Sequence, residues 1–320
     1  MTLFSFKQLI FDNKKELMGL AIILIMCYHS ELGENIKQFR LIYFVKELCD
    51  VGVDIFMMLS GFSLAVSLDN NNDLKIFFKK RIFRLLPSYL IVFSIWYAFL
   101  IMKDGGTLGQ FFWNISFLNY YIDYDLIVWF VPVIFLYYLF IPFYVKTVSK
   151  YKVLRFFPYI IIILNILLLT FNINPRFTLL RLPIFLIGAN MYLTSNNSAS
   201  STINIKFYLL LFAAIIGAAC SYYCMFIGEG VYAYKYIAYI PMTIILVSLY
   251  RKTPLSGILS FFGLITFEIY LLHERVQWIF GAIQFKLYPQ IPNIIVCLIS
   301  IVISIFAAYY LNKFVRKLIC

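Results

Sequence analysis

The chain has 320 residues, of which 63% are hydrophobic and only 13% are charged, and its mean hydropathy is +0.87. Soluble domains are only about half apolar, so this composition excludes a soluble protein and predicts an all-α polytopic membrane protein. The net charge of +12 does not indicate a nucleic-acid partner, because the Lys and Arg residues cluster beside apolar runs, where they contact lipid headgroups.

Apolar runs close to the ~20 residues needed to cross a bilayer recur along the chain, with short polar connections between them. We expect about ten transmembrane helices in a single integral-membrane domain over residues 1–320, with a cytoplasmic or interfacial segment at 1–15. The stretch SNNSASSTIN at 195–204 is typical of a flexible loop. The expected spans cover approximately residues 16–32, 48–68, 85–102, 127–145, 155–172, 178–194, 205–227, 233–250, 256–280 and 292–312.

The distribution of positive charge predicts the orientation of these spans. An even number of spans places both termini on the same side of the membrane. The connections on that side carry about twice as many Lys and Arg residues as the opposite set, which predicts that both termini are cytoplasmic. We expect a multi-pass protein of the cytoplasmic (inner) cell membrane, with membrane lipid as its surroundings.

The cysteines do not indicate a metal site. The chain has six cysteines, without a CxxC pattern or a Cys/His spacing that suits zinc. Cys220 and Cys224 share a helix face, and we interpret them as small reduced core residues. No bound metal is expected.

The first span carries a histidine, His29, near its outer end. His29 follows Lys15 by 14 positions, about 21 Å along a helix that rises ~1.5 Å per residue. Ionisable groups at membrane depth usually face a cavity or a partner, and a neutral imidazole can accept a proton from a hydroxyl. His29 is therefore a candidate general base. A histidine that is simply hydrogen-bonded at a helix interface is the alternative.

Two carboxylates enter the membrane with the second span, in CDVGVDIF at 49–56. Asp54 lies deeper in the apolar run than Asp50. It is the better candidate for a carboxylate that orients a catalytic histidine and stabilises its protonated form. Asp50 is interpreted as a solvated surface group.

A basic cluster, IFFKKRIFRLLPSY at 76–89, begins the third span on the cytoplasmic side. Arg81 and Arg84 are three residues apart and share a helix face. Paired guanidinium groups bind phosphate well, which makes the two arginines candidates for holding a phosphorylated ligand. The alternative is the ordinary basic end of a cytoplasmic helix.

The ninth span, in ITFEIYLLHERV at 265–276, carries Glu268 and His273 toward the outer side. A carboxylate in such an apolar run must be paired, protonated or exposed to water. His273 is about 140° around the helix from Glu268, so the two side chains do not share a face. Both a structural and a catalytic role for His273 remain open.

Five blocks in this chain resemble, in their order, the motifs of the integral-membrane acyltransferase family 3, which includes O-antigen and capsule O-acetyltransferases. The blocks are MGLAIILIMCYHS (18–30), VGVDIFMMLSGF (51–62), FFKKRIFRLLPSY (77–89), WFVPVIFLYYLFIP (129–142) and TFEIYLLHE (266–274).

The resemblance implies that His29 is the catalytic histidine and that Arg81 and Arg84 bind the acyl-CoA donor. It further implies a membrane O-acyltransferase, in the first place an O-acetyltransferase. Such an enzyme moves an acyl group from cytoplasmic acyl-CoA to hydroxyls of a surface polysaccharide or a lipid-linked glycan precursor. A flippase or transporter of lipid-linked sugars is the alternative, but it does not explain the five ordered blocks. The sequence does not indicate an oligomeric state.

The chain departs from the family pattern at two places. Many relatives have an arginine where this chain has Met18, so no donor contact is assigned there. Many also have a glutamate shortly after the tryptophan of the fourth block, where this chain has the apolar residues 132–135. Glu268 is our candidate for a substitute carboxylate. The predicted catalytic set is thus His29, Asp54 and Glu268.

Overall fold

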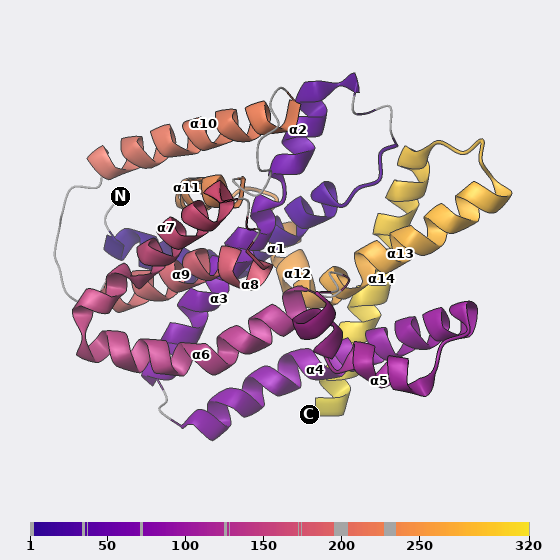
Figure 1. Cartoon of the computed structure of the whole chain (residues 1–320), viewed down its shortest axis with the longest axis horizontal. Coiled ribbons are helices and arrows are strands. Elements are labelled where there is room, and N and C mark those ends of the chain that lie inside the picture. The colour runs from indigo at the N-terminus through magenta and orange to yellow at the C-terminus, as the bar shows by residue number, and fades with distance from the viewer. Residues whose placement is uncertain are drawn as a thin grey trace. The chain divides into compact units, whose positions relative to one another are not determined.

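The computed structural model describes residues 3–33, 36, 38–70, 73–124, 127, 129–171, 173, 175–194, 204–226 and 235–319. These residues form helices and, within the described part of the chain, no strand (Figure 1), which confirms the all-α prediction. The predicted loop at 195–203 and the side chains of Cys220 and Cys224 lie outside the described residues.

Most of the described chain is helical, and the breaks between helices are short. Two brief irregular helices, η2 (Asn119–Asp123) and η3 (Lys152–Phe156), connect longer elements. The α-helices are α1 (Leu3–Tyr28), α2 (Arg40–Leu48), α3 (Val51–Asn70), α4 (Leu74–Asp104), α5 (Leu108–Ile115), α6 (Phe130–Lys150), α7 (Phe157–Thr170), α8 (Phe177–Leu180), α9 (Leu182–Thr194), α10 (Asn204–Phe226), α11 (Lys235–Leu249), α12 (Ser256–Leu264), α13 (Thr266–Leu287) and α14 (Asn293–Ile319).

Six stretches among the described residues are long and apolar enough to cross a membrane. They support the predicted multi-pass membrane protein. If α12 and α13 are counted together as one broken span, the number rises to 7. The count of about ten and the cytoplasmic termini stay predictions. The six stretches are Arg40–Asn70, Leu74–Asp104, Phe130–Lys150, Lys152–Thr170, Phe177–Thr194 and Asn293–Ile319.

Two helix breaks were only partly visible in the sequence. In α1, Asn13 has non-helical angles (φ −126°, ψ 20°), close to the predicted boundary between the interfacial segment and the first span. The helix expected over 256–280 is interrupted at Ile265 (φ −115°, ψ 16°). Ile265 and Thr266 are β-branched and Gly263 lies nearby, and all three have lower helix propensity than Leu264 between them. Hydropathy does not reveal such a break.

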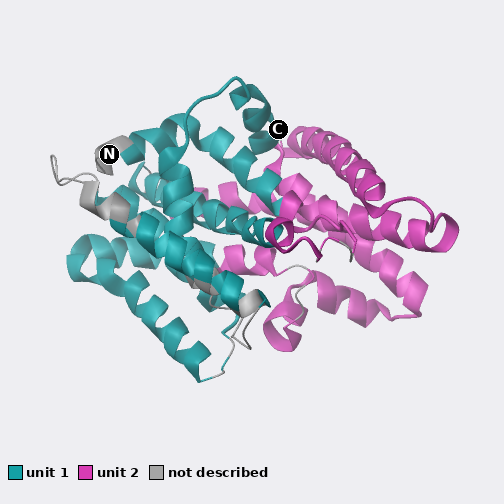
Figure 2. Cartoon of the chain, turned by 90° about the horizontal axis from the view of Figure 1, so that it is seen from above, with its two compact units in different colours: residues 1–25, 44–73, 137–264 teal, residues 26–43, 74–136, 265–320 magenta. Residues whose placement is uncertain are grey.

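The described chain packs as two compact units, each assembled from three segments that are distant in sequence (Figure 2). Unit 1 contains Met1–Ile25, Phe44–Asp73 and Tyr137–Leu264. Unit 2 contains Met26–Tyr43, Leu74–Leu136 and Ile265–Cys320.

In unit 1, glycines let helices α3 and α9 pack closely together. A Cβ atom added at Gly61 would lie 1.9 Å from the backbone oxygen of Phe185, and one added at Gly188 would lie 2.1 Å from that of Met58. Neither position can accept a side chain unless the helices move apart. Small residues at such contacts are characteristic of helix pairs in membranes, where van der Waals packing drives association.

In unit 2, helix α13 packs against α14 and α4. Aromatic side chains fill part of the space around α4: the rings of Trp96 and Trp278 meet edge to face at 5.3 Å, and Tyr89 donates a hydrogen bond to the backbone oxygen of Ile115 at 3.1 Å. The second contact joins α4 to α5. This packing fixes the face of α13 that carries the site described next.

Candidate active site

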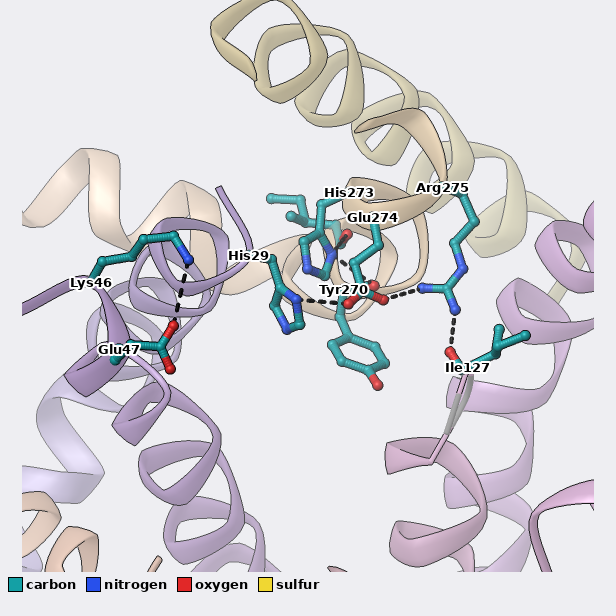
Figure 3. A network of polar contacts seen from close by, with 9 residues as sticks. His29, Lys46, Glu47, Ile127, Tyr270, His273, Glu274 and Arg275 are labelled. Atoms are coloured by element: carbon teal, nitrogen blue, oxygen red, sulfur yellow. Dashed lines mark hydrogen bonds and ion pairs between the residues drawn. The ribbon is translucent and has the colours of Figure 1, made fainter. Parts of the chain in front are cut away.

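His29 meets a carboxylate in unit 2, and that carboxylate is Glu274 (Figure 3). His29 follows the last residue of α1, whereas Glu274 lies on α13. The Nδ1 atom of His29 is 2.7 Å from Oε1 of Glu274, and the two side chains are 30% and 36% exposed. The pair is therefore both tightly hydrogen-bonded and reachable from outside the protein.

This contact decides which nitrogen of His29 carries the proton in the neutral ring. A carboxylate accepts a hydrogen bond, so Nδ1 of His29 must be the donor, and Nε2 is left with its lone pair. A carboxylate that orients a histidine in this way also stabilises the imidazolium once the ring takes up a proton. The C-terminal end of helix α1, directly before His29, favours the same positive charge. This geometry suits a general base, and the catalytic role of His29 stays a prediction.

Arg275 holds Glu274 in place. Its Nη1 atom lies 2.6 Å from Oε2 of Glu274, and its Nη2 atom donates to the backbone oxygen of Ile127 (Figure 3). The guanidinium also lies over the ring of Phe93, 4.9 Å from its centroid. The two oxygens of Glu274 thus have separate partners, one histidine and one arginine, which keep the carboxylate fixed and charged.

The second histidine of the chain lies beside the first. The rings of His29 and His273 meet edge to face with 5.2 Å between centroids. His273 is fully buried, and its Nδ1 atom donates to the backbone oxygens of Ile269 and Tyr270 at 3.0 and 2.9 Å. Its Nε2 atom is buried without a hydrogen-bond partner among the described residues. A buried acceptor of this kind is unusual in a folded protein and is consistent with a place at a functional site.

The same three side chains have ligand types that suit a divalent metal. His29, His273 and Glu274 each offer one atom, and these atoms lie within 4.8 Å of one another. Two imidazoles and a carboxylate form a set that zinc accepts. However, Glu274 already binds His29 and Arg275, so we interpret the group as a hydrogen-bonded pair with a neighbouring histidine. The absence of a metal stays a prediction.

Glu268 lies one and a half turns before this group, in the first turn of α13. It is only 5% exposed, and Ser88 on α4 donates a hydrogen bond to its Oε1 atom at 3.0 Å. Acidic side chains are common in the first turn of a helix, where the amino end carries partial positive charge. Glu268 thus joins α13 to α4, and its predicted catalytic role stays a prediction.

Asp54 lies in unit 1, in a separate charged cluster. Arg181, at the junction of α8 and α9, has its Nη1 atom 2.5 Å from Asp54 and its Nη2 atom 2.8 Å from Asp50. The guanidinium is 1% exposed, and the carboxylates are 1% and 7% exposed. Asp50 is therefore buried, which corrects its interpretation as a solvated group. The catalytic role predicted for Asp54 stays a prediction.

The two arginines expected to bind the donor lie in the first half of α4, in unit 2. Arg81 is half-buried, with its guanidinium 4.8 Å from the centroid of the Phe77 ring. Arg84 is exposed. Met18, at the position where many relatives have arginine, is buried in α1.

Sequence reasoning missed the partners of two predicted site residues: Glu274 binds His29, and Arg181 binds Asp54. For Arg181 the signal was present: an arginine inside the apolar run LLRLPIFLIG needs a buried anion, and two aspartates lie in another apolar run. For Glu274 the signal was weaker, because the residue could simply have marked the outer end of a helix. Only packing brings it to His29.

The chain matches the family model of the acyltransferase domain, acyltransferase family 3, over residues 17–313. No curated protein and no solved structure matches it. The match includes both histidines and the arginines of α4, and it gives no support to a transporter of lipid-linked sugars. The chain therefore belongs to acyltransferase family 3 and is a membrane acyltransferase.

Proposed function

We propose that the protein is an O-acyltransferase, in the first place an O-acetyltransferase, that uses cytoplasmic acyl-CoA. Its acceptor is a hydroxyl of a surface polysaccharide or of a lipid-linked glycan precursor. The observation that carries the proposal is the contact between His29 and Glu274, 2.7 Å long, in a chain of an acyltransferase family. That contact leaves a ring nitrogen available to activate a hydroxyl.

In the proposed reaction, Nε2 of His29 removes the proton of the acceptor hydroxyl as its oxygen attacks the thioester carbon. A carbon–oxygen bond forms and the carbon–sulfur bond breaks. The CoA sulfur then takes the proton from His29, and free CoA leaves. Glu274 stabilises the imidazolium between these two proton transfers, and Arg275 keeps Glu274 in position.

Arg81 and Arg84 are proposed to bind the phosphates of the donor. Guanidinium groups bind phosphate oxygens through pairs of charge-assisted hydrogen bonds. Both arginines belong to the same unit as His29, and the exposed Lys79 and Lys80 beside them add positive charge. Because Asp54 and Glu268 already have partners, Arg181 and Ser88, we propose that they position helices α3 and α13.

The proposal is tested with the purified full chain in lipid nanodiscs and radiolabelled acetyl-CoA. We expect H29A to lower acyl transfer by about 10²–10⁴-fold, the contribution of a general base. The variant should still insert and melt like the parent chain, because His29 is partly exposed. C27A, at an exposed position two residues away, is the matched control and should retain transfer. Near-normal transfer by H29A would refute the assignment.

A further inference from the structure

Unit 2 contains a pocket of about 320 Å³ that the proposed mechanism does not yet use. Helices α13 and α14 form its walls, and the segment that follows His29 contributes Glu31. Its volume is at the lower end of the range of small-molecule sites, about 300–1,000 Å³. The lining residues are Glu31, Gln277, Gly281, Gln284, Phe285, Pro289, Asn293, Val296, Cys297 and Ser300.

The pocket continues the helix face that carries His273. Residues three and four positions apart lie above one another on a helix. His273, Gln277, Gly281 and Gln284 follow that spacing along α13, and the last three line the pocket. On the other side Glu31 is two residues after His29. A ligand in the pocket therefore lies along the face of α13 that begins at the histidine pair.

Two polar residues of the pocket lining are buried. Gln277 is 5% exposed and Ser300 is fully buried. The amide nitrogen of Gln277 makes only a long contact, 3.9 Å, with the sulfur of Cys297, and its amide oxygen has no hydrogen bond among the described residues. A buried amide with unused capacity on a pocket wall is suited to binding a ligand that both donates and accepts hydrogen bonds.

The exposed part of the pocket lining contains an aromatic ring, a pair of hydrogen-bonded amides and one carboxylate. Phe285 is 83% exposed there, and Gln284 donates to the side-chain oxygen of Asn293 at 2.7 Å, which ties α13 to α14. Glu31 is the single charged group among the lining residues. An anionic ligand would be repelled by it, whereas neutral hydroxyls can donate to it.

We propose that this pocket binds the acceptor and that the acceptor is a neutral, polyhydroxylated sugar ring. Amide and carboxylate groups would bind its hydroxyls, and the exposed ring of Phe285 would cover one of its apolar faces. The inference rests on the proposed acyltransferase function and adds where the acceptor lies. It also explains why the inner wall of the pocket is polar in so apolar a protein.

Gly281 gives a direct steric test. A Cβ atom built there meets only Oε2 of Glu31, at 3.6 Å, an ordinary contact, so the backbone tolerates a side chain that then enters the pocket. G281L should fill the pocket, and G281A should have a smaller effect. Q277L removes the inner amide without changing the backbone. The matched control is G257L, because a Cβ atom at Gly257, in unit 1, has nothing within 4 Å.

The experiment uses the full chain in nanodiscs and radiolabelled acetyl-CoA. Methyl β-glucoside and methyl N-acetyl-β-glucosaminide serve as sugar acceptors, and ethanol serves as an acceptor without a sugar ring. For each variant the ratio of kcat/KM with glycoside to kcat/KM with ethanol is measured. We expect the ratio to fall about tenfold in Q277L, the effect of roughly one lost hydrogen bond. It should fall at least as far in G281L, whose side chain occupies the pocket, and stay constant in G257L.

The outcomes separate the two proposals. If acetyl-CoA turnover does not depend on His29, the proposed function fails. If turnover depends on His29 but the ratio is unchanged in both G281L and Q277L, the pocket does not bind the acceptor. His29-dependent turnover without transfer to either glycoside would overturn the sugar as the ligand class.

Discussion

Two groups of paired charged side chains, one in each unit, differ in how far they are buried. In unit 2 the His29–Glu274 pair is 30% and 36% exposed and leaves one ring nitrogen available. In unit 1 the Arg181 guanidinium is 1% exposed and binds two carboxylates at once. A partly exposed ion pair with an unused ring nitrogen has the geometry for proton transfer, whereas the buried cluster joins α3 to the junction of α8 and α9. Variants of each group test this contrast.

The largest effect is expected from removing Arg181, the cation of the buried cluster in unit 1. R181M leaves the carboxylates of Asp50 and Asp54 buried without their cation, which should lower the free energy of unfolding by about 3–5 kcal/mol. Thermal melting of the protein in nanodiscs measures the loss. R316M, at an exposed arginine of α14, is the control and should change the stability by less than about 0.5 kcal/mol.

The triple variant D50N/D54N/R181M sharpens that prediction. Replacing a whole buried ion pair is often close to neutral, because the desolvation penalty disappears with the charges. We expect most of the lost melting temperature to return. A triple variant as unstable as R181M would show that the charges themselves, and not their balance, maintain the packing of α3 and α9.

The next largest effect is expected at the His29–Glu274 pair. E274Q keeps the shape of the side chain but removes the charge that stabilises protonated His29, so kcat should fall about 10²-fold. The melting temperature should fall less than in R181M, because Glu274 is 36% exposed and water can partly replace its contact with Arg275. D104N, at an exposed carboxylate of the same unit, serves as the control. If E274Q unfolds more readily but its folded fraction keeps the full kcat, Glu274 has a structural role and not a catalytic one.

A smaller effect is expected at the donor arginines. R81Q/R84Q should raise the KM for acetyl-CoA about tenfold, as expected when a charge-assisted contact to phosphate is lost. The kcat at saturating donor should stay near that of the parent chain. Steady-state kinetics at varied donor concentration separates the two parameters. A reduced kcat with unchanged KM would contradict a role in donor binding.

The smallest effect is expected from the contact between α4 and α13. S88A removes the hydrogen bond to the buried carboxylate of Glu268, which should cost about 1 kcal/mol of unfolding free energy, the net contribution of one hydrogen bond. S63A, which removes only a hydroxyl bonded to its own helix at Leu59, is the control. If S88A lowers kcat and leaves melting unchanged, Glu268 acts in catalysis, as its position in the sequence first indicated.

Several features could be predicted from the sequence because they depend on short stretches of chain. Apolar composition alone excludes a soluble fold, since no soluble core could bury so much apolar surface. The ordered blocks around His29 and Arg81 indicate the family, and the family match over residues 17–313 confirms it. Depth along a helix follows from the rise per residue, and it singled out His29 as an ionisable side chain in the outer half of its span.

Only the tertiary structure decided which charged groups meet. Arg181 and Asp54 are separated by 127 positions, and Glu274 reaches His29 across most of the chain. Side chains at such separations meet only through packing, which hydropathy and helix periodicity do not contain. The break at Ile265 and the pocket between α13 and α14 arise in the same way. The sequence therefore determined the class of protein and its central histidine, whereas packing decided the partner of that histidine and the place proposed for the acceptor.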